Sequence, residues 1–293
     1  MPFVWPPRKR SVETTVVIPS SNITILPDLR SKTEFAGLLA RILATYRVDN
    51  VVIFKDRESS DEEANFLKLI LDYLLIPPYL RKRLVPVIPE LKFAGVLPPL
   101  NIVTHNPEGS RPKKGDLREG IVVTSYGVKA KVFIGYSKYC FTQSNRELNV
   151  NERVLIKVIN EEPLRCEVVS TDSINEYIGY RTHIALNERD LLELIKSFPG
   201  TLVLTSKDGD NYIRVPLRKA LIKSIKESGG VVLLFGNHSK DFNELVSKRF
   251  LREASIRFKI NFIPGQGVLS IRTLEALVAT LSLLNVDIET YGI

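Results

Sequence analysis

The chain has 293 residues, of which 44% are hydrophobic, and its 41 Lys and Arg against 33 Asp and Glu give a formal net charge of +8. This length and apolar content allow a sizeable core, and at roughly 100 to 200 residues per domain they favour two units. The basic balance favours a polyanionic partner, with nucleic acid as the leading class and a merely basic globular protein as the alternative.

Several classes of protein are disfavoured. Cys140 and Cys166 are the only cysteines and form no CxxC motif, so neither a disulfide framework nor a cysteine zinc site is indicated. The histidines, His105, His183 and His238, have no paired spacing, which argues against a metal site. Because no segment has the apolar length of a signal peptide core or a membrane span, we expect a cytoplasmic protein without a membrane segment.

The first part of the chain alternates strands and helices. Residues 12–20 and 51–54 are rich in Val, Ile and Thr and predict strands, whereas 34–48 and 61–75 have apolar residues at helical spacing. This order predicts a parallel sheet covered by helices. The prolines of residues 76–100 then predict an irregular connection instead of one long helix.

The middle of the chain has a different pattern. From about residue 103 to 172, short β-branched segments at 117–125, 128–135, 153–159 and 164–170 alternate with turns, without a convincing helix. We expect a small all-β barrel inserted into an α/β domain. The predicted boundaries are 1–102 for the first part of that domain, 103–172 for the insert and 173–293 for the second part.

Alternation resumes after the insert. The predicted strands are 177–186, 201–206, 231–236 and 257–263, and the predicted helices are 187–198, 215–228 and about 270–285. Three strand ends finish in small or polar residues at 205–210, 235–239 and 263–267, and ligands of open α/β sheets bind beyond the carboxyl ends of strands. A shared pocket is one interpretation, and glycines that let strands turn into helices are the other.

The third of these loops has specific turn chemistry. Pro264 and Gly265 suit the two central positions of a type II turn, and Gly267 permits close approach of the backbone to a ligand. The chain has no GxGxxG fingerprint, no P-loop and no GxSxG nucleophile elbow. A nucleotide-like ligand would therefore have to be bound by a loop of another type.

Residues 263–276, IPGQGVLSIRTLEA, preceded by TLVLTS (201–206) and VVLLFG (231–236), resemble the cofactor segment of the SPOUT methyltransferases. Residues 77–100, 117–123 and 177–186 narrow the resemblance to the archaeal and eukaryotic subfamily of RNA uridine methyltransferases with an OB-like insert. The resemblance implies a trefoil-knotted α/β domain with a Rossmann-like parallel sheet, an exception among folds. It also implies a homodimer and S-adenosylmethionine as the cofactor.

By position, the resemblance assigns the cofactor to the three loops. The implied cofactor-binding residues are Thr205, Ser206, Gly209, Phe235, Gly236, Asn237, Ile263, Pro264, Gly265, Gly267, Leu269 and Ser270. Relatives often carry a second glycine followed by an acid in the middle loop, whereas this chain has Lys240 where that glycine is expected. This departure puts the detail of the middle loop in doubt.

Methyl transfer from a sulfonium needs chiefly alignment, but a uridine N3 acceptor must also lose a proton. A general base, or a cation that stabilises the uridine anion, is therefore expected. Arg181 is the predicted catalytic residue, with Asp208 and Arg272 as further candidates. A surface salt bridge is the alternative role for each.

Aromatic and basic residues of the insert suggest an RNA-binding surface. Residues 132–141 alternate aromatics with lysines, as in OB folds that stack bases, although residues 103–172 hold 11 basic and 9 acidic side chains and are only mildly positive. Core packing is the alternative role of the aromatics, and solvation is that of the cations. The predicted RNA-binding residues are Arg81, Lys82, Arg83, Arg111, Lys113, Lys114, Lys131, Tyr136, Lys138 and Tyr139.

The sequence therefore predicts an S-adenosylmethionine-dependent RNA methyltransferase that modifies a uridine, with N3 favoured, in ribosomal or other structured RNA. The apolar face of the closing helix at 270–285 permits a homodimer. A non-catalytic RNA-binding or assembly factor with the same fold is the alternative, and a protein or DNA methyltransferase is a third possibility.

Overall fold

The computed structural model describes residues 4–292, which divide into two compact units. The larger unit contains Arg10–Asp72, Pro89–Pro98 and the chain from Gly179 onward. The smaller unit contains Tyr73–Ile88 and Pro99–Ile178, together with the described leader residues up to Lys9.

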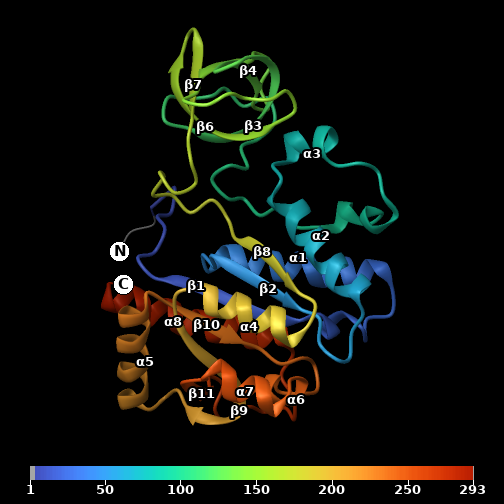
Figure 1. The fold of residues 1–293 in the computed structure, drawn as a ribbon, viewed down its shortest axis with the longest axis vertical. Coiled ribbons are helices and arrows are strands. Elements are labelled where there is room, and N and C mark those ends of the chain that lie inside the picture. Colours follow the sequence, from blue (N-terminus) through green and yellow to red (C-terminus); the bar gives the residue numbers. More distant parts are fainter. Residues whose placement is uncertain (1–3, 293) are drawn as a thin grey trace. The chain divides into compact units, whose positions relative to one another are not determined.

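A six-stranded parallel sheet forms the centre of the larger unit (Figure 1). Its strands lie in the order β11-β9-β10-β1-β2-β8, and every neighbouring pair is parallel. Their bounds are β1 Glu13–Pro19, β2 Asn50–Phe54, β8 Arg181–Ala185, β9 Thr201–Asn211, β10 Gly230–Leu234 and β11 Phe258–Asn261. Because β2 and β10 are buried along their whole length, they are almost continuously apolar, as expected of strands covered on both faces.

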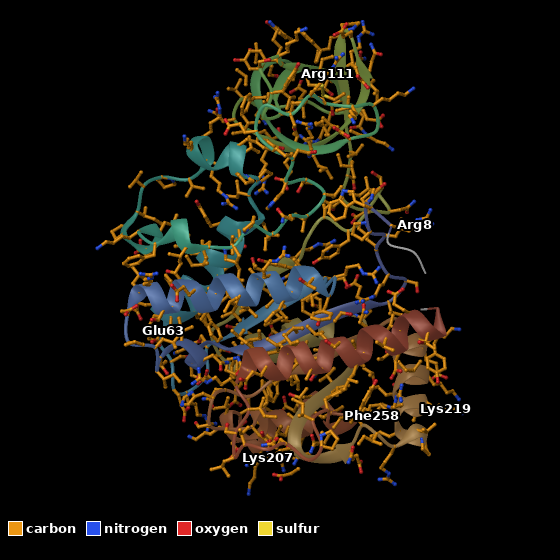
Figure 2. The ribbon with its side chains drawn as sticks, turned by 180° about the vertical axis from the view of Figure 1, so that it is seen from behind. Arg8, Glu63, Arg111, Lys207, Lys219 and Phe258 are labelled. Atoms are coloured by element: carbon orange, nitrogen blue, oxygen red, sulfur yellow. A yellow bond between two sulfur atoms is a disulfide. The ribbon has the colours of Figure 1, made fainter. Side chains whose placement is uncertain are left out.

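Helices cover both faces of this sheet (Figures 1 and 2). One face packs against α4 Glu188–Ser197, α6 Phe242–Leu245 and α7 Lys248–Ala254, which share a core cluster with alternate residues of the strands. The other face carries α1 Leu29–Thr45, α2 Asp61–Leu75, α5 Val215–Ser228 and α8 Thr273–Tyr291. A hydrogen bond of 2.6 Å between the hydroxyls of Tyr46 and Ser282 links α1 to α8. The prediction of a parallel sheet covered by helices is therefore confirmed.

Several elements differ from their predicted extents. Helix α1 begins at Leu29 and not at 34, because the Asp28 side chain caps it by accepting a hydrogen bond from the Ser31 N–H at 2.8 Å. Helix α8 begins at Thr273, after the predicted position 270. Within the stretch predicted to be irregular, Pro78–Leu84 forms α3, since a proline in the first turn removes no helical hydrogen bond.

The smaller unit contains a closed five-stranded barrel in the order β3-β4-β5-β7-β6, all of it within the predicted insert. The strands are β3 Leu117–Tyr126, β4 Lys129–Phe133, β5 Cys140–Gln143, β6 Arg153–Glu161 and β7 Leu164–Val168. Alternate residues of each strand fill the barrel with an apolar cluster. The short strand β5 was not among the predicted strands.

The cysteines correct one expectation. Cys140 of β5 and Cys166 of β7 are joined as a disulfide inside the barrel, with their Cα atoms 6.0 Å apart. Both side chains belong to the buried core cluster, and their strands pair in parallel. Spacing along the sequence could not reveal this pairing, because it depends on β5 and β7 being neighbours in the closed barrel.

Candidate functional site

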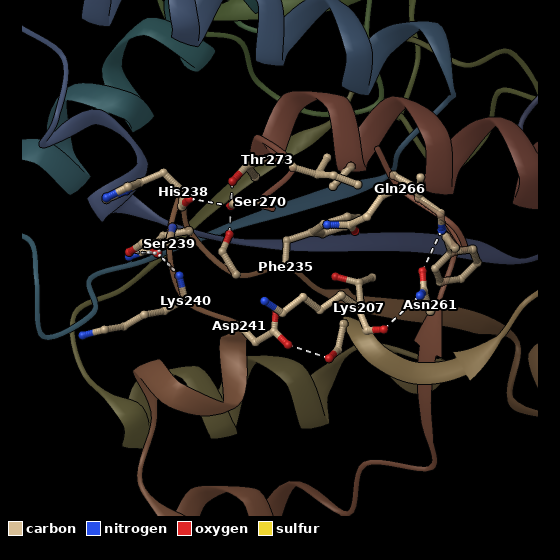
Figure 3. Close-up of a pocket in the computed structure, with 18 of the residues that line it drawn as sticks. Lys207, Phe235, His238, Ser239, Lys240, Asp241, Asn261, Gln266, Ser270 and Thr273 are labelled. Atoms are coloured by element: carbon tan, nitrogen blue, oxygen red, sulfur yellow. Dashed lines mark hydrogen bonds between the residues drawn. The ribbon is translucent and has the colours of Figure 1, made fainter. Parts of the chain in front are cut away.

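A pocket of about 390 Å³ opens at the carboxyl ends of β10 and β11, beside residues 205–207 within β9, in the larger unit (Figure 3). Its volume is within the range typical of small-molecule sites. The lining residues are Thr205, Ser206, Lys207, Phe235, Gly236, Asn237, His238, Ser239, Lys240, Asp241, Glu244, Ile260, Asn261, Phe262, Ile263, Gln266, Leu269, Ser270, Ile271, Thr273, Ala276 and Thr280.

The wall from β9 is a strand and not the loop predicted for 205–210. Strand β9 continues to Asn211 and pairs with β11 through a register shift between Lys259 and Ile260. This pairing requires Gly209, because a Cβ there would lie 2.6 Å from the backbone of Ile260. At the pocket itself, the Thr205 hydroxyl donates to the Leu234 carbonyl at 2.9 Å, and the Ser206 hydroxyl bonds the Asp241 carboxylate at 2.5 Å.

The middle loop, residues 235–241, follows β10 and is organised by the buried amide of Asn237. Its side-chain oxygen accepts from the Lys240 N–H at 2.8 Å, and its side-chain nitrogen donates to the Ser21 hydroxyl at 2.9 Å and to the Glu58 carboxylate at 2.7 Å. Ser21 follows β1 and Glu58 follows β2, so one side chain ties together the loops of three neighbouring strands.

Gly236 and Lys240 complete the middle loop. A Cβ on Gly236 would lie 2.2 Å from the Lys240 carbonyl oxygen, so the tight turn tolerates only glycine there. The Lys240 ammonium forms an ion pair with Glu58, and this hydrogen bond holds the pKa of Glu58 below its usual value. Lys240, where a glycine was expected, is thus a bridge from the middle loop to the loop after β2.

The third loop returns from β11 to α8 and contacts the middle loop. Pro264 and Gly265 form the predicted turn, in which Gly265 has a φ of 72° that suits glycine. The Ser270 hydroxyl donates to the His238 carbonyl at 2.9 Å. The Thr273 hydroxyl donates to the Asn22 side chain at 2.6 Å and to the Gly236 carbonyl at 3.2 Å, so the start of α8 is tied to the same edge.

Most of the residues assigned to the cofactor meet at this pocket. Those that line it are Thr205, Ser206, Phe235, Gly236, Asn237, Ile263, Leu269 and Ser270. Gly209, Pro264, Gly265 and Gly267 do not line it. Gly209 and Gly265 have conformational and packing roles instead, and a Cβ on Gly267 would meet nothing within 4 Å.

The polar residues that follow β1 and β2 were not predicted to belong to the site. Ser21 and Asn22 are buried in a short 3-10 helix, Ser20–Ile23, and the buried Asp56 accepts a hydrogen bond from the Ser21 N–H at 3.1 Å. The signal was present, since polar residues directly after a buried strand had already marked the three loops of the second block. The order β10-β1-β2 in the sheet explains why these residues meet.

Arg181, the predicted catalytic residue, lies away from the pocket. It begins β8 beside Asn50, the first residue of β2, whereas the pocket lies where strands end. Strand β8 is three strands from β10, or about 14 Å at the usual spacing of about 4.8 Å. Asp208 is exposed on β9, and the Arg272 N–H donates to the Glu275 carboxylate at 2.9 Å at the start of α8; neither residue lines the pocket.

Two residues predicted to bind RNA make contacts within the smaller unit. Arg81 donates to the Ile76 carbonyl at 2.9 Å and its guanidinium lies 4.6 Å from the Tyr73 ring centre, and burial lowers its pKa. Tyr136 packs against the core cluster of the barrel. In contrast, Lys82, Lys113, Lys114, Lys138 and Tyr139 are exposed.

The remaining cations that were predicted to bind RNA each contact an aromatic ring or an acid. The Arg83 guanidinium lies 4.3 Å from the Phe133 ring centre, and Arg111 pairs with Glu162 at 3.3 Å. The Lys131 ammonium lies 5.6 Å from the Phe141 ring centre. These contacts leave the side chains at the surface of the smaller unit, and their role in RNA binding stays a prediction.

Two absences concern residues 4–292, the part of the chain that the structure describes. In this part of the chain, no group of three or more His, Cys, Asp and Glu side chains is arranged to hold a metal ion. No helix among the same residues has the length and apolar character needed to cross a membrane.

Comparison with known proteins adds a family. A family model described as "Putative RNA methyltransferase" matches residues 13–284. An uncharacterized protein of Halobacterium salinarum is 31% identical, in an alignment that covers 91% of this chain and 96% of the relative. The human 28S rRNA (uridine-N(3))-methyltransferase is 29% identical over 94% of this chain and 79% of its own length. The Drosophila melanogaster protein of the same name is 24% identical over 94% and 62%.

Proposed function

The chain belongs to the RNA methyltransferase family, and we propose that it transfers a methyl group from S-adenosylmethionine to a uridine base of RNA, with N3 as the favoured atom. The observation that carries this proposal is the pocket beside β9 and at the carboxyl ends of β10 and β11, which is lined by eight of the residues assigned to the cofactor. Relatives named as uridine-N(3)-methyltransferases of 28S rRNA support uridine as the acceptor and ribosomal or other structured RNA as the substrate.

The pocket has the chemistry that S-adenosylmethionine requires. Phe235, Ile260 and Phe262 offer apolar surface for an adenine ring, and Asp241 and Glu244 offer carboxylates to a ligand that carries a sulfonium and an ammonium group. Among the described residues, the buried Nδ1 atom of His238, a residue that lines the pocket, has no hydrogen-bond partner. A polar ligand supplies such a partner.

The chain's own residues position the reaction. When bound, the cofactor would supply an electrophilic methyl group, and the transfer requires the acceptor nitrogen to lie in line with the sulfonium. The N3 proton must pass to a base. Asp241 is the candidate base, because it lines the pocket and its carboxylate accepts a hydrogen bond from the Ser206 hydroxyl. Arg181 contributes to this chemistry only if a second copy of the chain brings it to the pocket.

The proposal includes the architecture implied by the family. We infer a SPOUT domain in two parts, 1–102 and 173–293, interrupted by an OB-like insert at 103–172. The contacts of Ser270 and Thr273 with the middle loop, which bring the chain after β11 back against the end of β10, support a trefoil knot there. A homodimer is supported by the exposed apolar side chains of Val278, Leu283 and Val286 on α8.

Calorimetry with S-adenosylmethionine tests the cofactor half of the proposal. We expect the full chain to bind it and Gly236→Ala to lose that binding, because the added Cβ meets the Lys240 carbonyl oxygen. Gly95→Ala is the matched control, since a Cβ at Gly95 meets nothing within 4 Å. Melting curves of both variants separate a distorted loop from an unfolded protein. Absence of binding by the unmodified chain at millimolar cofactor would favour the non-catalytic RNA-binding factor.

A further inference from the structure

A second hollow, of about 480 Å³, lies on the outside of the barrel in the smaller unit. The residues that line it come from β4, β5, the segment before β5 and the turn between β6 and β7. They are Lys131, Lys138, Tyr139, Phe141, Glu161, Glu162, Pro163 and Leu164. None of them contributes to the pocket in the larger unit.

Two aromatic rings are presented to solvent at this hollow. Strand β5 alternates, with Cys140 and Thr142 buried in the barrel and Phe141 on its outer face, where 51% of the residue is exposed. Tyr139 is 43% exposed. Tyr136, in the same segment, packs against the core cluster, so the barrel buries one of its aromatics and leaves these two outside.

Cations flank the exposed ring of Phe141. In the strand register, Phe141 pairs with Lys131 of β4 on one side and with Arg165 of β7 on the other. The Lys131 ammonium lies 5.6 Å from the Phe141 ring centre, and Lys138 lines the same hollow. The outer face of the barrel therefore presents one aromatic ring between two cationic side chains.

The two acids that line the hollow, Glu161 and Glu162, have partners of their own. Arg111, labelled on the barrel in Figure 2, lies 3.3 Å from a Glu162 oxygen and 3.9 Å from a Glu161 oxygen. Glu161 also accepts a hydrogen bond from the Lys114 N–H at 3.1 Å. By comparison, Lys131, Lys138 and Arg165 form no ion pair with any residue that the structure describes. The side chains of Lys131, Lys138 and Arg165 are therefore available to contact an anionic partner.

We propose that this hollow binds a single-stranded segment of RNA, with a base stacked on Phe141 beside Tyr139 and phosphates contacted by Lys131, Lys138 and Arg165. An acidic peptide would use the cations but not the flat ring faces, whereas a nucleotide uses both. The inference rests on the proposed function in that RNA is the substrate. It adds a capture site on the barrel that is separate from the methyl-transfer pocket.

Fluorescence anisotropy with a labelled ten-nucleotide oligouridine and the full chain tests the proposal. Loss of one stacked base costs about 1–3 kcal/mol, so Phe141→Ala should weaken binding by about fivefold to 150-fold, and Phe141→Trp should retain it. Tyr126→Ala is the matched control: Tyr126 is a 67% exposed aromatic at the end of β3 that does not line the hollow, and its removal should change affinity less than twofold.

Salt dependence tests the cationic contacts. For single strands, each lost phosphate contact should reduce the slope of log affinity against log salt by about 0.7, so Lys131→Ala and Lys138→Ala should each flatten it by about that amount. Equal effects of Phe141→Ala and Tyr126→Ala would overturn the proposal. So would competition by polyglutamate as effective as competition by unlabelled oligouridine, which would indicate a peptide site.

The two proposals fail in different ways. Calorimetry of Phe141→Ala with S-adenosylmethionine should give the unmodified affinity, because Phe141 lies outside the cofactor pocket. If the unmodified chain binds oligouridine through Phe141 but does not bind the cofactor, the capture site is supported and the proposed methyl transfer is contradicted. If it binds the cofactor but Phe141→Ala has no effect on oligouridine, only the capture site falls.

Discussion

Asp49 lies at the amino-terminal edge of the sheet, just before β2, and its carboxylate accepts a hydrogen bond from the Thr14 N–H at 2.8 Å. Burial raises the pKa of Asp49 to about 6, and the charge of Glu13 adds to the rise. The Thr14 N–H and the charges of Arg10 and Arg181 act in the opposite direction but do not cancel it. The folded chain therefore holds a proton on Asp49 at pH values where the unfolded chain, with a pKa of 3.8, has lost it.

This shift predicts a pH effect that Asp49→Asn removes. Because the folded pKa is raised, the free energy of unfolding should fall as pH rises from about 4 through 6, by up to about 3 kcal/mol at about 1.4 kcal/mol per pH unit. Asparagine resembles the protonated acid and still accepts from the Thr14 N–H. In denaturant titrations, the stability of the variant minus that of the unmodified chain should therefore grow across this window. Parallel curves would contradict the assignment.

At the scale of elements, the middle loop depends on one buried amide more than on its surface ion pair. Asn237 bonds the loops after β1 and β2 and also caps its own turn through the Ser239 and Lys240 N–H groups. The Lys240–Glu58 pair is partly exposed, and such pairs contribute only about 0–1 kcal/mol. Loss of a partner from buried polar groups costs more, about 1–3 kcal/mol.

Paired variants of the loop should separate these contributions. We expect Asn237→Ala to raise the dissociation constant of S-adenosylmethionine by more than about tenfold, because the loop loses its anchors. Lys240→Ala removes the surface ion pair but keeps the backbone hydrogen bonds of the turn, so it should change the dissociation constant by less than about fivefold. Calorimetry of the two proteins measures both values. Equal losses of affinity would show that Lys240 itself contacts the ligand.

An element was predictable from the sequence when the contacts that form it are local, and it was missed when they join residues far apart in the chain. The buried strands β2 and β10 and helix α2 were predictable from composition and periodicity, since each is specified by its own residues. The extension of β9 to Asn211 was not, because it depends on Gly209 admitting the Ile260 backbone of a strand about 50 residues later. The pairing of Cys140 with Cys166 depends likewise on barrel closure.

At the scale of the whole molecule, the sheet order decides which loops form the site. The family string at 263–276 and the strand ends before it predicted the loops after β10 and β11. The contributions of Ser21, Asn22 and Glu58 were missed, because only the placement of β1 and β2 beside β10 brings residues from the first block to this edge. Arg181 was chosen by local motif alone, and the parallel direction of β8 puts it at the other end of the strands.

Self-association is the property of the whole molecule that the proposal makes testable. We expect sedimentation to show a dimer, and Val286→Glu to shift it toward monomer by placing a charge on an apolar contact. Val286 is 58% exposed on α8, so the single chain should tolerate the change. Val87→Glu, at a fully exposed position in the smaller unit, is the control and should leave the dimer intact. A monomer for the unmodified chain would contradict the dimer.

The most direct test of the central claim is mass spectrometry of nucleosides from host RNA, with and without a functional copy of this protein. Methyl transfer to uridine N3 predicts that 3-methyluridine is lost from RNA without the protein and restored by the unmodified chain, but not by Gly236→Ala. An unchanged nucleoside profile would contradict the claim, and methyl groups that appear instead in protein or DNA would assign the chain a different acceptor.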